Sequence, residues 1–119
     1  MSDHLNYYKK IKSIPTVNLD DLRLNILFKQ IENFYFCLGI TKQNFYKKSI
    51  LELCAGTGLN AYFLKKSFKI KKMKLLDKNP ESLRLINKNL SKYKNIKIIN
   101  KNLNKFSSAE KFDYLILQN

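Results

Sequence analysis

Residues 49–63 constrain the fold of this chain more than any other part of the sequence. They begin with a nearly continuous apolar run, residues 50–55, which is typical of a strand buried on both faces of a parallel sheet. Gly56 and Gly58 follow, and residues 59–66 then show the apolar spacing of a helix. A glycine turn between a strand and a helix N-terminus brings backbone N–H groups close to a ligand and favours an anionic group. The segment therefore predicts a ligand-binding turn in an α/β fold.

Glu52 is the unusual residue of this apolar run. A carboxylate inside a buried strand is unfavourable unless a hydrogen-bond donor reaches it. We therefore expect Glu52 to have a partner, either in the turn that follows the strand or in the ligand itself.

The sequence Glu-Leu-Cys-Ala-Gly-Thr-Gly at residues 52–58 resembles motif I of the class I S-adenosylmethionine (SAM) methyltransferases, an acid-x-Gly-x-Gly-x-Gly pattern after a hydrophobic strand. Cys54 stands where the first glycine usually does, and because cysteine is small we expect the loop to keep its form. The glycines also fit a dinucleotide-binding fingerprint, with Ala61 as its last residue. Glu52 favours the methyltransferase, since the corresponding position of a dinucleotide-binding strand is usually apolar.

The rest of the chain alternates between strand and helix patterns. Further strands are predicted at residues 73–77, 95–100 and 112–117. A helix between the first two of these begins with Asn79 as its N-cap and Pro80 at its first position. The alternation is typical of right-handed βαβ units. We therefore expect an α/β fold with a Rossmann-like parallel sheet in the order 3-2-1-4, flanked by helices.

The N-terminal part of the chain, residues 1–48, is predicted to be a helical segment that packs on the sheet. Its main helix spans residues 19–38, where apolar side chains recur at helical spacing, and Gly39 sits where a helix-ending glycine is expected. Residues 41–48 are predicted to be a connector. Residues 49–119 then form a partial SAM-binding domain, the part that the resemblance covers.

The predicted ligand site lies where the strands end, because open α/β sheets bind ligands beyond the carboxyl ends of their strands. Asp77 ends the second predicted strand about twenty residues after Gly58, the spacing of an acid that binds the hydroxyls of a ribose. The resemblance implies the same role for Asp77, and a solvated acid at a strand end is the alternative. The resemblance also implies that Asn102 lies near the adenine amino group and that Leu103 packs on the ring, with an ordinary loop asparagine as the alternative.

The resemblance implies a SAM site that consists of Glu52, Cys54, Gly56, Gly58, Asp77, Asn102 and Leu103. The resemblance implies transfer of a methyl group from the SAM sulfonium to a nucleophile, an in-line displacement that needs no metal and depends on positioning. Catalytic residues of the family often lie beyond the fourth strand, so no catalytic residue is predicted. The methyl acceptor stays open between a small molecule, an RNA and a protein. Asp113, within the fourth predicted strand, is interpreted as structural.

The net charge of +14 suits a nucleic-acid partner, but its composition weakens that hypothesis. All of the 23 basic residues except Arg23 and Arg84 are lysines, whereas recognition of phosphates and base edges favours arginine. A nucleic-acid partner is therefore supported by net charge alone. The absence of an 18-residue apolar run predicts no membrane span. With a polar N-terminus and only two cysteines, the sequence predicts a cytoplasmic protein without a disulfide framework or a metal cluster.

Two other functions stay open beside the methyltransferase. The first is the dinucleotide-binding domain of an NAD-dependent oxidoreductase, and the second is a non-catalytic nucleic-acid-binding module. The family's sheet usually has more strands than this sequence predicts. We therefore expect a fragment that does not catalyse methyl transfer alone, or a chain that a partner completes.

Overall fold

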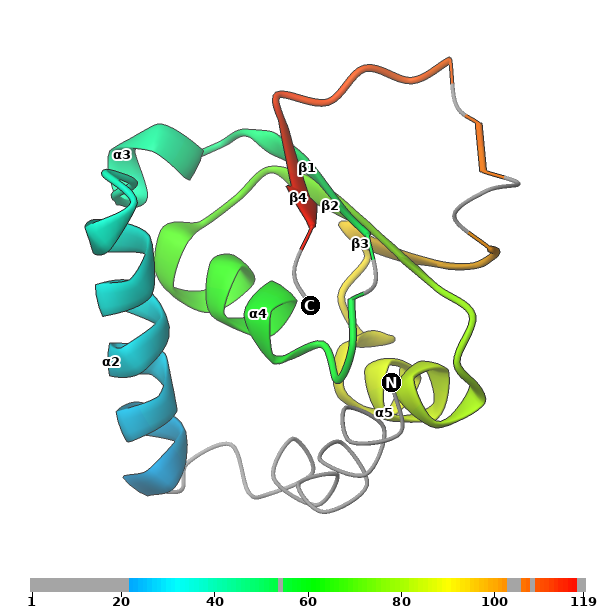
Figure 1. Ribbon diagram of the computed structural model, residues 1–119, viewed down its shortest axis with the longest axis horizontal. Coiled ribbons are helices and arrows are strands. Elements are labelled where there is room, and N and C mark those ends of the chain that lie inside the picture. Colours follow the sequence, from blue (N-terminus) through cyan, green and yellow to red (C-terminus); the bar gives the residue numbers. More distant parts are fainter. Residues whose placement is uncertain (1–21, 54, 103–105, 108, 118–119) are drawn as a thin grey trace.

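The computed structural model describes residues 22–53, 55–102, 106–107 and 109–117 (Figure 1). Its four strands form one parallel sheet in the order β3-β2-β1-β4. The strands are β1 (Ser49–Leu53), β2 (Lys72–Asp77), β3 (Ile96–Asn100) and β4 (Tyr114–Leu117). The predicted Rossmann-like sheet and its strand order are confirmed.

The strand boundaries differ from the predicted ones by one or two residues, and two apolar residues that were predicted to lie in strands lie outside them. Ala55 still donates its N–H to the Leu76 carbonyl at 3.3 Å, but it belongs to the turn after β1. Phe112 lies in the connection before β4, where it packs against a small apolar cluster on the sheet. Apolar character alone therefore overstated the length of both strands.

The helical elements are α2 (Leu22–Cys37), α3 (Lys42–Phe45), α4 (Leu59–Phe63), the π-helical turn η2 (Leu64–Phe68) and α5 (Pro80–Leu90). The helix predicted at residues 19–38 is seen as α2, and its first three residues lie outside the described part. Gly39 has a φ of 78°, as a helix-ending glycine should. Asn79 caps α5 by accepting the N–H groups of Glu81 and Ser82.

Residues 41–48 are more than a connector, so this prediction was wrong in part. They contain the single turn α3, which begins after Thr41. The Asn44 side chain accepts the Thr41 backbone N–H at 2.8 Å, which stabilises this turn locally. Phe45 at its end is buried in the main core, which explains why the segment folds back onto the domain.

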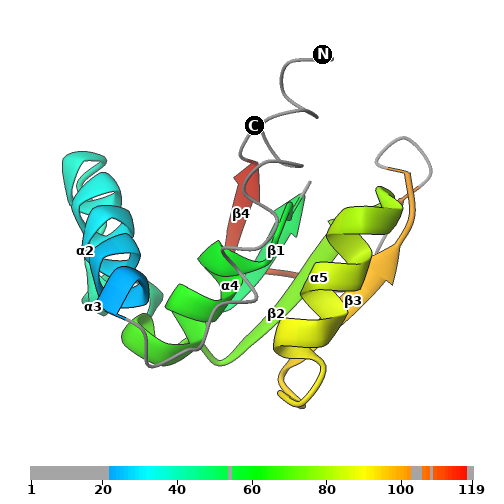
Figure 2. The ribbon, with the colours of Figure 1, turned by 90° about the horizontal axis from the view of Figure 1, so that it is seen from below.

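Helices α4 and α5 lie on one face of the sheet, and α2 lies beside α4 (Figure 2). Phe28 of α2 contacts the rings of Tyr62 and Phe63, with centroid distances of 5.5 and 5.3 Å. Tyr35 of α2 and Ile50 of β1 belong to one buried cluster, so the core joins residues on both sides of position 49. The division at this position stays a prediction.

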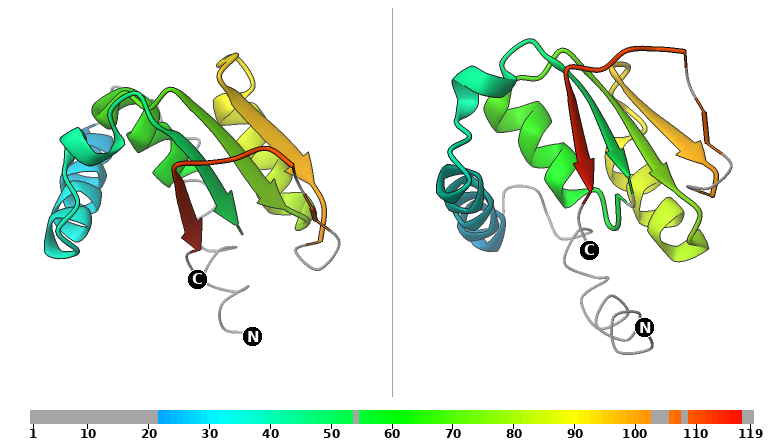
Figure 3. Two further views of the ribbon diagram at one scale, coloured as in Figure 1. Left: turned by 90° about the horizontal axis from the view of Figure 1, so that it is seen from above. Right: turned by 45° about the horizontal axis from the view of Figure 1, so that its top comes forward.

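The opposite face of the sheet is crossed by the chain that leads into β4 (Figure 3). A second buried cluster on this face consists of Leu51, Leu53 and Leu76, with Ile99, Phe106 and Phe112 packed against it. Glu110 binds the ammonium groups of Lys72 at 2.7 Å and Lys74 at 2.5 Å. Leu115 and Leu117 of β4 remain 64% and 60% exposed.

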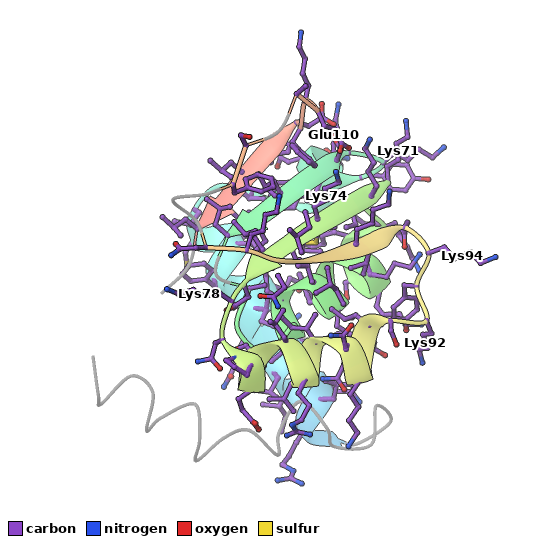
Figure 4. The ribbon with its side chains drawn as sticks, turned by 90° about the vertical axis from the view of Figure 1, so that its right-hand side faces the viewer. Lys71, Lys74, Lys78, Lys92, Lys94 and Glu110 are labelled. Atoms are coloured by element: carbon purple, nitrogen blue, oxygen red, sulfur yellow. The ribbon has the colours of Figure 1, made fainter. Side chains whose placement is uncertain are left out.

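The lysines lie at both ends of the strands. Lys71, Lys92 and Lys94 lie at the end where the strands begin, and Lys78 lies at the other end (Figure 4). The positive charge is therefore spread over the molecule and not confined to the edge where the strands end. No helix within the described residues is long and apolar enough to cross a membrane.

Candidate functional site

The turn after β1 and the end of β2 are joined by a hydrogen bond. Gly56 donates its backbone N–H to Asp77 Oδ2 at 3.0 Å. Gly56 and Gly58 have φ values of 66° and 85°, which L-residues with a side chain rarely adopt. The two glycines therefore allow the chain to turn sharply at the carboxyl end of the sheet, directly beside Asp77.

Asp77 organises two loops at once. Its second carboxylate oxygen, Oδ1, accepts the backbone N–H groups of Lys78 at 2.8 Å and Asn79 at 2.9 Å. The half-buried carboxylate thus holds the glycine turn and the start of α5 in fixed positions. A carboxylate has about four acceptor sites, so three backbone partners leave capacity for a ligand hydroxyl.

Glu52 lies one residue before the end of β1 and is 1% exposed. Asn60, in the first turn of α4, donates its side-chain Nδ2 to Glu52 Oε2 at 3.0 Å. Tyr35 of α2 in turn donates its hydroxyl to Asn60 Oδ1 at 2.6 Å. Glu52 therefore has a hydrogen-bond partner, as expected, but this partner lies in α4 and not in the glycine turn or a ligand. Glu52 Oε1, in contrast, has no hydrogen-bond partner in the described part of the chain.

Burial raises the pKa of Glu52 from its ordinary value of 4.5 to about 8. The hydrogen bond from Asn60 acts in the opposite direction, and the negative charge of Asp77 raises the pKa further. The neutral form of Glu52 is therefore favoured at pH 7, one residue before β1 ends.

Gly58 is required by packing as well as by its backbone conformation. A Cβ atom at this position would lie 3.0 Å from Leu90 Cδ1 and 3.4 Å from Ile86 Cγ1. Both neighbours belong to α5. The glycine thus allows α5 to approach the turn closely, and a larger residue would disturb this packing.

Four of the predicted site residues come together at one edge of the sheet: Glu52, Gly56, Gly58 and Asp77. Asn102 follows β3 at the same edge and is half-buried. Cys54 and Leu103 lie outside the described residues, so their predicted roles stay predictions.

Sequence reasoning missed Asn60 and Tyr35, which hold Glu52. A polar residue at position 60, directly after the glycine turn, was a signal that could have been read as a partner for the buried acid. Tyr35 gave no such signal, because it lies among apolar residues of a helix and is 25 positions from Asn60.

Asp113 lies at the other end of the sheet, where its side chain binds Ser49 at the start of β1. Its Oδ2 accepts the Ser49 backbone N–H at 2.8 Å and the Ser49 hydroxyl at 3.1 Å. The Asp113 backbone N–H in turn donates a hydrogen bond to the Ser49 carbonyl at 2.9 Å. These contacts, led by the backbone N–H of Ser49, lower the pKa of Asp113. Within the described residues, no group of three or more His, Cys, Asp or Glu side chains could hold a metal ion.

Several solved structures that share this fold are described as methyltransferases. A candidate SAM-dependent methyltransferase from Methanococcus maripaludis is 16% identical with a TM-score of 0.63, over 93% of this chain and 49% of that one. A candidate RNA methyltransferase from Pyrococcus horikoshii is 21% identical with a TM-score of 0.58, over 76% of this chain and 42% of that one. Coclaurine N-methyltransferase, bound to N-methylheliamine and S-adenosylhomocysteine, is 13% identical with a TM-score of 0.60, over 75% of this chain and 26% of that one.

The chain thus spans less than half the length of each of these proteins. No curated protein matches it. The family model of the methyltransferase small domain matches residues 37–119, which include β1 to β4. This match confirms the resemblance to class I SAM methyltransferases that motif I predicted, and the chain belongs to the methyltransferase small domain family.

Proposed function

We propose that this chain binds SAM at the carboxyl ends of β1 and β2 and forms the cofactor-binding part of a methyltransferase. The observation that carries the proposal is the 3.0 Å hydrogen bond from Gly56 to Asp77, which brings the motif I turn against the acid at the end of β2. The unpartnered Glu52 Oε1 supports it, because a buried polar atom without a partner beside a glycine turn suits a ligand that forms a hydrogen bond with it. The residues at this edge therefore fit SAM.

Each residue of the site has a separate role in this proposal. Gly56 and Gly58 let the backbone approach the cofactor closely, and Asp77 accepts hydrogen bonds from the ribose hydroxyls. The side-chain carbonyl of Asn102 accepts a hydrogen bond from the adenine amino group, and Leu103 packs on the adenine ring. Cys54 occupies the first glycine position of the turn. These assignments follow the family pattern, from which this chain departs at Cys54.

When bound, SAM supplies a methyl group on a positively charged sulfur, and a nucleophile's lone pair bonds to the methyl carbon as the carbon–sulfur electron pair returns to sulfur. The contribution of this chain is to bind and orient the cofactor at a fixed edge of the sheet. The short backbone contacts of Asp77 hold that edge in place before the cofactor arrives.

The methyl acceptor is not assigned. The related structures include a candidate RNA methyltransferase and an enzyme bound to N-methylheliamine, so acceptors differ among proteins of this fold. The comparisons give no support to the NAD-dependent oxidoreductase or to the nucleic-acid-binding module. The cytoplasmic location, the interpretation as a fragment and the inactivity of the chain alone stay predictions.

Calorimetric titration of the chain with SAM, S-adenosylhomocysteine and NAD in parallel tests the proposal. SAM and S-adenosylhomocysteine should bind and NAD should not. The Asp77→Ala variant should weaken SAM binding by about 1–3 kcal/mol, or roughly 5- to 150-fold, because the ribose hydroxyls lose their acceptor.

Asp113→Ala is the matched control, since Asp113 also accepts backbone hydrogen bonds but lies at the opposite end of the sheet. This variant should bind SAM as the unchanged protein does. NAD binding without SAM binding would overturn the proposal, and equal SAM affinities of the two folded variants would overturn the placement of the ribose.

A further inference from the structure

We propose that Tyr35 of α2 controls the protonation of Glu52 through Asn60, so that binding of the cofactor releases a proton from the site. Tyr35 is then a positioning residue, which acts on the cofactor site without touching it. The inference rests on the proposed function, because it requires SAM to bind beside Glu52.

The argument begins with the orientation of the Asn60 amide. An amide side chain has an acceptor oxygen on one side and a donor nitrogen on the other. Because the Tyr35 hydroxyl donates to Oδ1 at 2.6 Å, the Nδ2 donor is the side that faces Glu52, at 3.0 Å. Tyr35 and Asn60 are 2% and 9% exposed, so water does not compete freely for these contacts.

A donor aimed at Glu52 Oε2 favours the ionised carboxylate over the neutral acid. Without the Tyr35 hydroxyl, the Asn60 amide would be free to rotate and to present its oxygen to Glu52 instead. An acceptor in that place favours the protonated acid. Tyr35 thus lowers the free energy required to ionise Glu52, although it lies on a helix that precedes the whole sheet.

The other surroundings of Glu52 oppose ionisation. Its neighbours in the sheet ladder are Leu75 on β2 and Ile116 on β4, and α5 contributes apolar side chains such as Ile86 to the same core. The charged group that acts on it is Asp77, which carries the same sign. The second oxygen, Oε1, has no donor among the described residues. The hydrogen bond from Asn60 therefore favours the ionised form of Glu52, whereas burial and the like charge of Asp77 favour the neutral form.

SAM carries an ammonium group and a sulfonium, so a cofactor bound at this edge brings positive charge and further N–H donors toward Glu52, whose Oε1 has no donor among the described residues. The ionised carboxylate then becomes the favoured form, and its proton passes to the solvent. The carboxyl pKa of about 8 means that about nine-tenths of the cofactor-free protein is protonated at pH 7. Binding at pH 7 should accordingly release about 0.9 proton per cofactor, and about half a proton at pH 8.

Two measurements on the full chain test this inference. The first is a carbon-13 NMR titration of glutamate-labelled protein, in which Glu52→Gln identifies the Glu52 signal. The second is calorimetry of SAM binding in buffers of different ionisation enthalpy, which counts the protons released. Three single variants are compared with the unchanged protein: Tyr35→Phe, Tyr46→Phe and Glu52→Gln.

Tyr35→Phe should raise the titration midpoint of Glu52 by about half to one pH unit, because it removes one hydrogen bond from the chain of contacts. Proton release at pH 8 should rise from about half toward one. Tyr46→Phe removes the hydroxyl of a tyrosine that is 46% exposed, so neither quantity should change. Glu52→Gln should abolish the proton release.

The outcomes separate this inference from the proposed function. If SAM does not bind to the unchanged chain, the proposed function fails. If SAM binds without release of a proton at pH 7, or if Glu52 of the unchanged chain titrates below about pH 6, the linkage is overturned even when Tyr35→Phe does not fold. If Tyr35→Phe folds and its Glu52 has the same titration midpoint as in Tyr46→Phe, the proposed role of Tyr35 is overturned.

Discussion

The buried carboxyl of Glu52 should make the cofactor-free protein less stable as the pH rises, which is opposite to the effect of most carboxylates. In the folded protein its pKa is about 8, against an ordinary value of 4.5 that applies to the unfolded chain. Between these values the folded state holds more protons, so the stabilising contribution is complete below about pH 4.5 and is lost as the pH rises through 8. The loss between pH 5 and pH 9 is about 4 kcal/mol, a large share of the ~5–15 kcal/mol typical of a domain.

Urea unfolding followed by circular dichroism at several pH values measures this effect. The Glu52→Gln variant keeps an acceptor for the Asn60 amide but cannot ionise, so it should lack this part of the pH dependence. The difference between the two proteins removes the contribution of every other titrating group. If the unfolding free energies of the two proteins run parallel from pH 5 to pH 9, Glu52 is not neutral in the folded state and the reasoning fails.

Three further predictions concern the glycine turn, Asp77 and the ion pairs of Glu110. Gly58→Ala should destabilise the fold by about 1–3 kcal/mol more than Gly39→Ala in urea unfolding, because both positions have positive φ but only at Gly58 would the new Cβ press against Leu90. Asp77→Ala should lower the unfolding free energy by about 1–3 kcal/mol even without cofactor, since three backbone N–H groups lose their acceptor. Hydrogen bonds from two lysines lower the pKa of Glu110 to about 2. The contribution of Glu110 to the stability of the fold is therefore present above about pH 4.5 and is lost as the pH falls through 2. Acid unfolding of the unchanged protein and of Glu110→Gln, followed by circular dichroism in low and high salt, measures this contribution. It should be absent in Glu110→Gln, and salt should weaken it in the unchanged protein. A difference between the two proteins that does not depend on salt would contradict an electrostatic origin.

Much of the fold could be predicted from local sequence signals. The apolar run before Gly56 identified the central strand, and Asn79 with Pro80 identified the start of α5. The strand–helix alternation predicted the order of the sheet, because handedness leaves few topologies for such a pattern. Asp77 was found from its spacing, and its contact with Gly56 shows why the spacing matters.

The parts that could not be predicted depend on contacts between distant segments. Glu52 was recognised as needing a partner, but the sequence did not show that Tyr35 and Asn60 form a chain of hydrogen bonds to it. Apolar spacing alone did not place Tyr35 in the core, because Phe34 and Leu38 beside it are exposed. It also does not tell which buried hydroxyl finds a polar partner. The single turn α3 was missed because four residues are too few to show a period.

The reciprocal hydrogen bonds between Ser49 and Asp113 also bear on the order in which the chain folds. They join residues 64 positions apart, whereas β1, β2 and β3 pair through shorter connections. Closure of a long loop is slower and entropically less favourable, so the pairing of β4 with β1 should complete the sheet after the other three strands have met. Contacts that form late in folding chiefly determine how fast the native state opens. Asp113 therefore stabilises the strand that pairs last. Its replacement should speed unfolding more than it slows folding.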